Sequence, residues 1–309
     1  MQGLSIIKTS HYTPNHVVTN DDLKEFIDTS DEWITSRTGV STRYFAKNEQ
    51  NIDLAMHVTR ELVEGIPIEE IGAIIVATFT PDYQTPSMAC MIQKQLELPS
   101  KVLAFDLNAA CSGFLYGLYV ARGLLFQDPT KKVLLVGSEK ISPYMDFTDR
   151  NTCILFGDGA GGVLLTLSDN RNDSFEFQTY GDDDSIVCRR MIEDPYIHMN
   201  GKAVYSFAVN AVLTGIQEVL GKSNKDISEI NHFVCHQANI RIIKYVYEKL
   251  NLDPNKFFIN LNKYGNTSGA SIPIALSEMN QQGLLSHGDT LILIGFGAGL
   301  TWGASLLTW

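Results

Sequence analysis

The stretch Leu107-Asn108-Ala109-Ala110-Cys111-Ser112-Gly113 sets one cysteine between a strand and a helix. Residues 102–107 before it are largely apolar, and residues 114–126 after it carry apolar residues at helical spacing. A thiol at a helix N-terminus faces backbone N–H groups and the positive end of the helix dipole, which favour the thiolate. A buried, inert thiol is the usual state of a single cysteine. The turn and its glycine favour a nucleophile here, so we predict a catalytic role for Cys111.

A second stretch, Leu261-Asn262-Lys263-Tyr264-Gly265-Asn266-Thr267-Ser268-Gly269, repeats this arrangement in the other half of the chain. Strands alternating with helices predict an α/β fold with mainly parallel sheets covered by helices. We therefore predict two similar lobes from an internal duplication, residues 1–168 and residues 169–309, joined at the polar stretch 168–173. The paired segments are 73–77 and 232–236, 87–96 and 239–250, 114–126 and 272–281, and 133–137 and 291–295.

Cys111, His236 and Asn266 each fall just past a predicted strand. Catalytic groups of open α/β sheets lie beyond the carboxyl ends of strands, so lobes packed as a pseudo-dimer would bring all three to one cleft. Cysteine, histidine and asparagine together support nucleophilic catalysis. Because asparagine replaces a carboxylate, both partners can donate hydrogen bonds to a developing oxyanion, which suits an enolate. The alternatives are a structural histidine and an asparagine that serves only its turn.

The composition excludes several classes of function. The chain has 309 residues, 44% of them hydrophobic, which suggests about two domains with substantial cores. A net charge of −11 argues against nucleic-acid or membrane-surface binding, although a local basic patch could still dock an acidic partner. The five cysteines form no C-x-x-C pair, so we expect neither a disulfide framework nor a zinc site. The N-terminal residues do not resemble a signal peptide, so we expect a cytoplasmic protein.

Two glycine-rich segments invite other interpretations. Residues 157–162 fit G-x-G-x-x-G, but they lead into the strand-like run 163–167 instead of opening a helix, so we reject a dinucleotide site. Residues 291–309 carry no charge and could be taken for a membrane helix. Their density of glycine favours a buried strand, a turn and a second strand.

Several motifs, taken in order, carry a specific resemblance over nearly the whole chain. The sequence resembles the thiolase-like condensing enzymes and, within them, the β-ketoacyl-acyl-carrier-protein synthase III family. The motifs are Asp28-Thr29-Ser30-Asp31-Glu32-Trp33-Ile34, Arg37-Thr38-Gly39, Ala109-Ala110-Cys111-Ser112-Gly113-Phe114, Thr148-Asp149-Arg150, Leu155-Phe156-Gly157-Asp158-Gly159-Ala160-Gly161, His236-Gln237-Ala238-Asn239-Ile240-Arg241-Ile242-Ile243, Asn262-Lys263-Tyr264-Gly265-Asn266-Thr267-Ser268 and Gly299-Leu300-Thr301-Trp302-Gly303.

The resemblance implies a layered αβαβα fold, a homodimer and a decarboxylative condensation. Cys111 would take an acyl group from an acyl-CoA primer, with its own backbone N–H and that of Ala298 forming the oxyanion hole. His236 and Asn266 would hold the thioester oxygen of malonyl-acyl-carrier protein while carbon dioxide leaves. The product would be a β-ketoacyl-carrier protein, the first elongation product of fatty-acid synthesis. The CoA thioester is a substrate, and no metal or redox cofactor is implied.

The resemblance also implies binding residues. Trp33 and Arg150 would sandwich the CoA adenine, a use that suits a flat aromatic ring and a planar guanidinium. The other implied residues are Thr29 and Arg37 near CoA, Leu155 and Phe156 in the cleft wall, and Arg241 and Lys244 as a docking site for the acidic carrier. The alternatives are a half-buried anchor for Trp33, a salt bridge to Asp149 for Arg150, and a solvated face for Lys244.

The sequence departs from the family pattern at several places. Thr85 stands where many relatives have a phenylalanine that closes the acyl pocket across the dimer interface, so we expect primers longer or more branched than acetyl. Ser206 replaces a carrier-binding lysine, and Ala298 replaces a glycine but keeps its N–H. The segment 181–200 is short, which would alter the cleft mouth.

Three other functions stay open at this point. A condensing or acyl-transfer enzyme of secondary metabolism would use a different acceptor, so malonyl-CoA against malonyl-carrier protein discriminates it. A cysteine hydrolase would cleave acyl-CoA rapidly without a carrier. A non-catalytic CoA- or carrier-binding protein would need no activated thiol, and the complete triad argues against it.

Overall fold

Two β-sheets form the framework of the chain in the computed structural model, which describes residues 2–169 and 173–309. The first sheet has the strand order β1-β7-β6-β4-β5 and the second has the order β11-β12-β13-β8. The strands are β1 (Gln2–Tyr12), β4 (Ile71–Ala77), β5 (Leu103–Leu107), β6 (Lys132–Glu139), β7 (Gly159–Asp169), β8 (Ser174–Thr179), β11 (His232–Cys235), β12 (Thr290–Gly297) and β13 (Thr301–Thr308). Two small ribbons add β2 (Val17–Thr19) with β3 (Thr42–Tyr44), and β9 (Ile186–Cys188) with β10 (Ile197–Met199).

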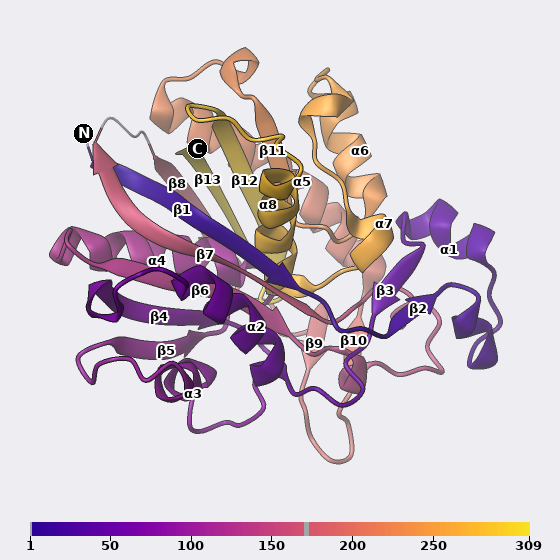
Figure 1. The fold of residues 1–309 in the computed structure, drawn as a ribbon. Helices are drawn as coiled ribbons and strands as arrows, with labels where there is room; N and C mark the ends of the chain where they lie inside the picture. The colour runs from indigo at the N-terminus through magenta and orange to yellow at the C-terminus, as the bar shows by residue number, and fades with distance from the viewer. Residues whose placement is uncertain (1, 170–172) are drawn as a thin grey trace.

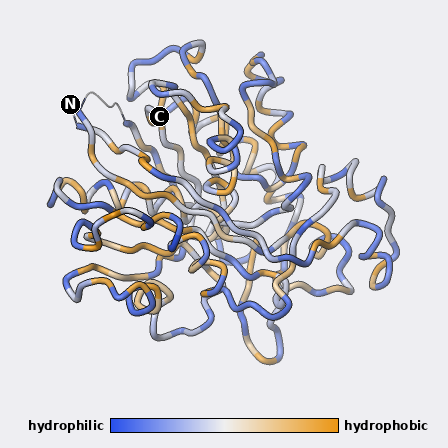
Figure 2. The backbone as a smooth tube through the Cα atoms, in the orientation of Figure 1, coloured by the Kyte–Doolittle hydropathy of each residue, from blue (hydrophilic) through white to orange (hydrophobic). Residues whose placement is uncertain are grey.

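Helices form three layers around these sheets (Figure 1). Helices α2 (Asn51–Val63) and α3 (Met88–Gln95) cover the outer face of the first sheet, and α5 (Gly201–Ser223) and α6 (Ile240–Lys249) lie on the outer side of the second. Between the sheets run α4 (Gly113–Gln127) and α8 (Ser271–Gln281). Hydrophobic residues gather in the strands and on the helix faces next to them (Figure 2). The predicted αβαβα layering is confirmed. Helix α1 (Asp31–Thr38) lines the cleft described below, and α7 (Leu261–Tyr264) leads into the turn that carries Asn266.

The predicted α/β fold is confirmed, and each sheet combines a parallel part with antiparallel strands. Strand β4 pairs parallel with β5 and β6, and β11 pairs parallel with β12. The remaining pairs of the two sheets, β1 with β7, β6 with β7, β12 with β13 and β13 with β8, are antiparallel. One antiparallel pair follows directly from its connection, because β12 and β13 are joined by a tight turn, which can only link antiparallel strands.

The duplication is visible in the backbone of the two turns. The Asn108 side chain accepts a hydrogen bond from the Ala110 N–H at 3.1 Å, and the Asn266 side chain accepts one from the Ser268 N–H at 2.8 Å. Ala110 and Ser268 both have positive φ, 46° and 50°, an uncommon conformation for residues with a side chain. A short 3-10 helix and then α4 or α8 follow each turn. Asn266 therefore corresponds to Asn108.

Main chain of the two halves comes into close contact beside the two turns. A Cβ atom on Gly137, in β6, would lie 2.3 Å from the carbonyl oxygen of Gly269. A Cβ on Gly269 would lie 3.4 Å from the carbonyl oxygen of Ala110. The contact between the halves is therefore made by backbone, and a glycine is needed at Gly137 because any side chain would collide with the facing carbonyl.

Two segments that are apolar enough to be taken for membrane helices belong to the core of the fold. Residues 291–309 lie in β12 and β13, as predicted, and not in a helix. Helix α5 is long and apolar enough to span a membrane by length and composition alone. It packs against β8, β12 and β13 with buried residues on that face, which is the arrangement of a core helix. Of the predicted junction 168–173, residues 170–172 lie outside the described residues.

Candidate active site

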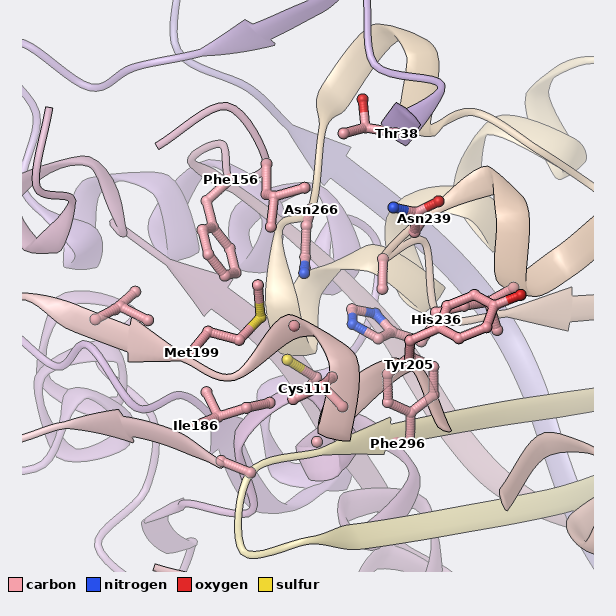
Figure 3. A pocket seen from close by; sticks show the side chains of 18 of the residues that line it. Thr38, Cys111, Phe156, Ile186, Met199, Tyr205, His236, Asn239, Asn266 and Phe296 are labelled. Atoms are coloured by element: carbon pink, nitrogen blue, oxygen red, sulfur yellow. The ribbon is translucent and has the colours of Figure 1, made fainter. Parts of the chain in front are cut away.

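A cavity of about 440 Å³ opens between the two halves of the chain, and Cys111, His236 and Asn266 all line it. Figure 3 shows the three side chains pointing toward one another, from the start of α4, the end of β11 and the turn before α8. The structure thus brings together the three residues that the sequence predicts as a catalytic set.

Cys111 lies in a 3-10 turn, Ala110–Ser112, that leads directly into α4. The pKa of its thiol is raised to about 12, chiefly by burial, with the Ser268 hydroxyl and the backbone N–H of Cys111 acting to lower it and the Glu139 carboxyl acting to raise it. Burial therefore outweighs the helix N-terminus, which by itself favours the thiolate. The resting thiol is neutral and needs a base before it can attack.

His236 follows β11, and its backbone N–H donates to the carbonyl of Ile294 at 2.8 Å. Its Nδ1 lies 2.7 Å from the hydroxyl of Ser271, and its ring meets that of Phe296 edge-on at 5.4 Å. Burial lowers the pKa of His236 to about 3. The imidazole is therefore neutral at physiological pH, with one nitrogen that donates and one that accepts.

Asn266 is held by its backbone and by its own side chain. Its N–H donates to the carbonyl of Leu155 at 2.8 Å, and its carbonyl accepts from the N–H of Gly157 at 3.0 Å. Its side-chain oxygen accepts from the Ser268 N–H. That bond assigns the amide orientation and leaves the NH₂ group facing the cavity and the Cys111 sulfur (Figure 3). Asn266 is thus positioned as a hydrogen-bond donor.

The β12–β13 turn closes one side of the cavity. Gly297 packs tightly on the 3-10 turn Ala110–Ser112, called the nucleophile turn from here on. A Cβ atom on Gly297 would lie 2.8 Å from the backbone nitrogen of Cys111. The Ser112 hydroxyl donates to the carbonyl of Thr301 at 3.3 Å, which ties the turn to the start of α4. Ala298 lines the cavity beside Cys111, where both backbones could serve an oxyanion.

Glu139 is a buried carboxyl beneath this site that the sequence did not single out. It accepts hydrogen bonds from the hydroxyls of Thr78 and Thr80 at 3.0 and 2.5 Å. Burial raises its pKa to about 7. The Ser268 hydroxyl is buried, makes no hydrogen bond of ordinary geometry, and lowers the pKa of both Glu139 and Cys111.

The mouth of the cavity carries a cation–aromatic stack. The guanidinium carbons of Arg37 and Arg150 lie 4.4 and 4.3 Å from the ring centre of Trp33. Trp33 and Arg37 line the cavity, whereas Arg150 lies outside its lining and donates to the carbonyl of Asp28 at 2.9 Å. Arg150 is already stacked on Trp33, so an adenine ring placed between these two side chains would have to displace the Arg150 guanidinium.

The other predicted site residues divide into two groups. Leu155, Phe156 and Arg241 line the cavity. Thr29, Thr85 and Lys244 do not, and Thr85 is exposed on the surface of its own chain.

Sequence reasoning missed one wall altogether. Ile186 and Cys188 of β9 and Ile197 and Met199 of β10 line the cavity, followed by Tyr205 of α5. The alternation of apolar residues in these two strands could have indicated a hairpin with one buried face. Each strand is only three residues long, which is too short for the pattern to stand out.

The comparisons with known proteins agree over the whole chain. The family profile "3-Oxoacyl-[acyl-carrier-protein (ACP)] synthase III" matches residues 105–182, and the profile of its C-terminal part matches residues 220–309. The β-ketoacyl-[acyl-carrier-protein] synthase III of Clostridium tetani is 44% identical, with 98% of each chain covered.

Solved structures give the same result. The 3-oxoacyl-[acyl-carrier-protein] synthase III from Aquifex aeolicus superimposes with a TM-score of 0.95 at 42% identity, covering 99% of this chain and all of that one, 100%. The enzyme from Pseudomonas aeruginosa gives 0.94 at 37% identity, covering 99% and 98%. The fold is therefore thiolase-like, and the chain belongs to the β-ketoacyl-[acyl-carrier-protein] synthase III family of condensing acyltransferases.

Proposed function

We propose that the enzyme condenses an acyl-CoA primer with malonyl-acyl-carrier protein through an acyl group carried on Cys111. The observation that supports this most directly is the convergence of a neutral thiol, a neutral imidazole and an amide donor on one cavity. The family initiates fatty-acid synthesis by this condensation, and the residues of this chain can be given a role in each half-reaction.

In the first half-reaction, the Cys111 proton passes to the accepting nitrogen of His236 as the sulfur attacks the primer thioester. The tetrahedral oxyanion is stabilised by the backbone N–H groups of Cys111 and Ala298. The thioester bond to CoA breaks, and the CoA thiolate leaves with the proton from His236. A base is needed because burial keeps the thiol protonated.

In the second half-reaction, the malonyl carboxylate leaves as carbon dioxide and its bonding electrons form an enolate. His236 and Asn266 donate hydrogen bonds to the enolate oxygen, a contact that strengthens as charge develops. The enolate carbon attacks the acyl carbonyl on Cys111. The sulfur leaves and takes up a proton that originates from solvent, which restores the resting thiol.

The cavity walls support a primer larger than acetyl. Apolar side chains of Phe156, Ile186 and Met199 surround the space next to Cys111 (Figure 3). For CoA we propose the Trp33, Arg37 and Arg150 cluster, with Thr29 nearby. Thr85 does not line the cavity of its own chain, so its expected effect on primer size requires a second copy of the chain.

We propose a homodimer formed along the edge of the first sheet. Strand β5 is an edge strand, and its Leu103 is 54% exposed. Unpaired apolar edges are normally covered, and a second copy would extend the sheet. Tyr119 and Phe126 of α4 are also exposed.

The remaining partners follow from the same proposal. Arg241, at the cavity, and Lys244, one turn further along α6, would dock the acidic carrier. We take residues 1–168 and residues 169–309 as the two lobes of the chain. We infer a cytoplasmic enzyme without a cofactor, for which the CoA thioester is a substrate.

Intact-protein mass spectra after incubation with acetyl-, isobutyryl- and octanoyl-CoA test the proposal, with Cys111→Ala as the control. Adducts should form on the unmodified enzyme only, and malonyl-carrier protein should discharge them as β-ketoacyl-carrier protein. Absence of any adduct would remove the role of Cys111. Rapid loss of adducts to water would favour a hydrolase, and discharge by malonyl-CoA alone would favour a different acceptor.

A further inference from the structure

Arg43, the middle residue of β3, is among the largest side chains that the fold buries completely. Burial lowers its pKa to about 10, so the guanidinium is still positively charged at physiological pH. Within the described residues, its Nε has no hydrogen-bond partner, and none of the ion pairs includes it. A buried cation without a counter-charge costs free energy, which an apolar side chain of similar size would avoid. Stability alone therefore does not explain an arginine at this position.

The guanidinium of Arg43 holds one backbone segment, residues 154–157. Its Nη2 donates to the carbonyl of Ile154 at 2.8 Å, and this bond is buried. Its Nη1 lies 3.5 Å from the carbonyl of Val18 in the neighbouring strand β2, at the outer limit of a hydrogen bond. A hydrogen bond from a charged donor is about twice as strong as a neutral one. The main effect of the guanidinium is therefore to fix the carbonyl of Ile154.

The same segment holds the backbone of Asn266. The Asn266 N–H donates to the carbonyl of Leu155, and the Gly157 N–H donates to the carbonyl of Asn266. Ile154, whose carbonyl accepts from Arg43, directly precedes Leu155 in the chain. The position of the Asn266 amide therefore depends on a backbone segment that Arg43 fixes.

Arg43 also packs against the two glycines next to these contacts. A Cβ atom on Gly265 would lie 3.3 Å from the Cβ of Arg43, and a Cβ atom on Gly157 would lie 3.1 Å from it. Strand β3 is bonded to the segment before Gly265 as well, because the Thr42 hydroxyl donates to the carbonyl of Lys263 at 2.9 Å. The Arg43 side chain therefore starts where segments 154–157 and 263–266 meet.

We propose that Arg43 is a positioning residue, which holds the Asn266 amide where it can donate to the enolate oxygen during decarboxylation. This inference rests on the proposed function of Asn266. The groups proposed for acyl transfer lie on other elements, namely the nucleophile turn, the end of β11 and the β12–β13 turn. Loss of the Arg43 guanidinium should therefore affect decarboxylation far more than acylation of Cys111.

Arg43→Met removes the guanidinium and keeps a long side chain in its place. The carbonyl of Ile154 then loses its buried donor, so the segment 154–157 and the Asn266 backbone bonded to it can shift. A displacement of reacting groups approaching 1 Å costs about 10²-fold in rate. We expect decarboxylation to fall roughly 10- to 100-fold, and Cys111 acylation by acetyl-CoA to change by less than about threefold.

The two half-reactions are measured separately. Decarboxylation is followed as acetyl-carrier protein formed from malonyl-carrier protein in a Cys111→Ala background, and acylation is followed by intact-protein mass without carrier. The matched control is Arg122→Met, because Arg122 is a partly buried arginine that pairs with Asp173 at 2.8 Å and lies outside the cavity lining. It should leave both half-reactions unchanged.

A double-mutant cycle gives a readout that a merely structural role would not produce. In an Asn266→Ala background no amide is left to position, so adding Arg43→Met should lower the remaining decarboxylation by less than about threefold. A further loss in that background as large as the loss caused by Arg43→Met alone would overturn the inference. Equal losses in decarboxylation and acylation would overturn it as well.

A second variant covers the case in which Arg43→Met does not fold. Arg43→Lys keeps the positive charge but replaces the fork of donors with a single ammonium group, so it should show the same imbalance to a smaller degree. If the unmodified enzyme neither acylates nor decarboxylates, or if Asn266→Ala decarboxylates at the full rate, the proposed function itself is wrong.

Discussion

Replacing Gly297 by alanine adds one methyl group directly against the nucleophile turn. The new Cβ would lie 2.8 Å from the nitrogen of Cys111, 3.1 Å from that of Ser112 and 3.3 Å from the Cβ of Cys111, where ordinary contact begins at 3.4 Å. Two of these neighbours are backbone atoms in a buried turn, so no flexible side chain can move aside. The nucleophile turn or the β12–β13 turn must shift.

The expected size of the effect follows from that shift. Overpacking a buried site costs about 1–3 kcal/mol of stability. A displacement of reacting groups approaching 1 Å costs about 10²-fold in rate. Since the overlap is a few tenths of an ångström, we expect Gly297→Ala to lower Cys111 acylation by roughly 10- to 100-fold while the protein remains folded.

The measurement pairs urea unfolding with the rate of adduct formation from acetyl-CoA. Gly221→Ala is the matched control, because a Cβ on this α5 glycine meets nothing within 4 Å. It should gain about 0.5–1 kcal/mol of stability with unchanged acylation. Full acylation by Gly297→Ala at reduced stability would refute the argument that the turn contact sets the position of the thiol.

Three further predictions test individual groups. Asn266→Asp keeps the oxygen that accepts from the Ser268 N–H but replaces the NH₂ donor with a carboxylate oxygen. Decarboxylation should therefore fall about 10²-fold or more while Cys111 acylation changes little. Equal losses in both half-reactions would contradict a donor role for Asn266. The pKa of Glu139 is raised to about 7, so the native state keeps a proton that the unfolded chain has lost above about pH 4.5. Stability should therefore fall by about 3 kcal/mol as the pH rises from about 4.5 to about 7, and urea titrations of Glu139→Gln should lack this component. Trp33→Ala should raise the KM for acetyl-CoA roughly 3- to 30-fold with little change in kcat, and an unchanged KM would place CoA elsewhere.

The convergence of Cys111, His236 and Asn266 on one cavity could be predicted because these residues stand in turns that local sequence defines. The positive φ of Ala110 and Ser268 could not be predicted, since neither residue type requires it. The pKa of Cys111 depends on burial, which is a property of the assembled fold. The direction of β13 follows from the tight turn at 298–300, which makes it antiparallel to β12.

The backbone contact between Gly137 and Gly269 separates two properties of the enzyme. Cys111 and Asn266 stand on opposite sides of this contact, so the gap across which the new carbon–carbon bond forms is set by main chain. One wall of the chamber is built instead from side chains of β9, β10 and α5. Mutation can therefore resize the chamber, and with it the choice of primer, while the spacing of the reacting atoms is inherited unchanged.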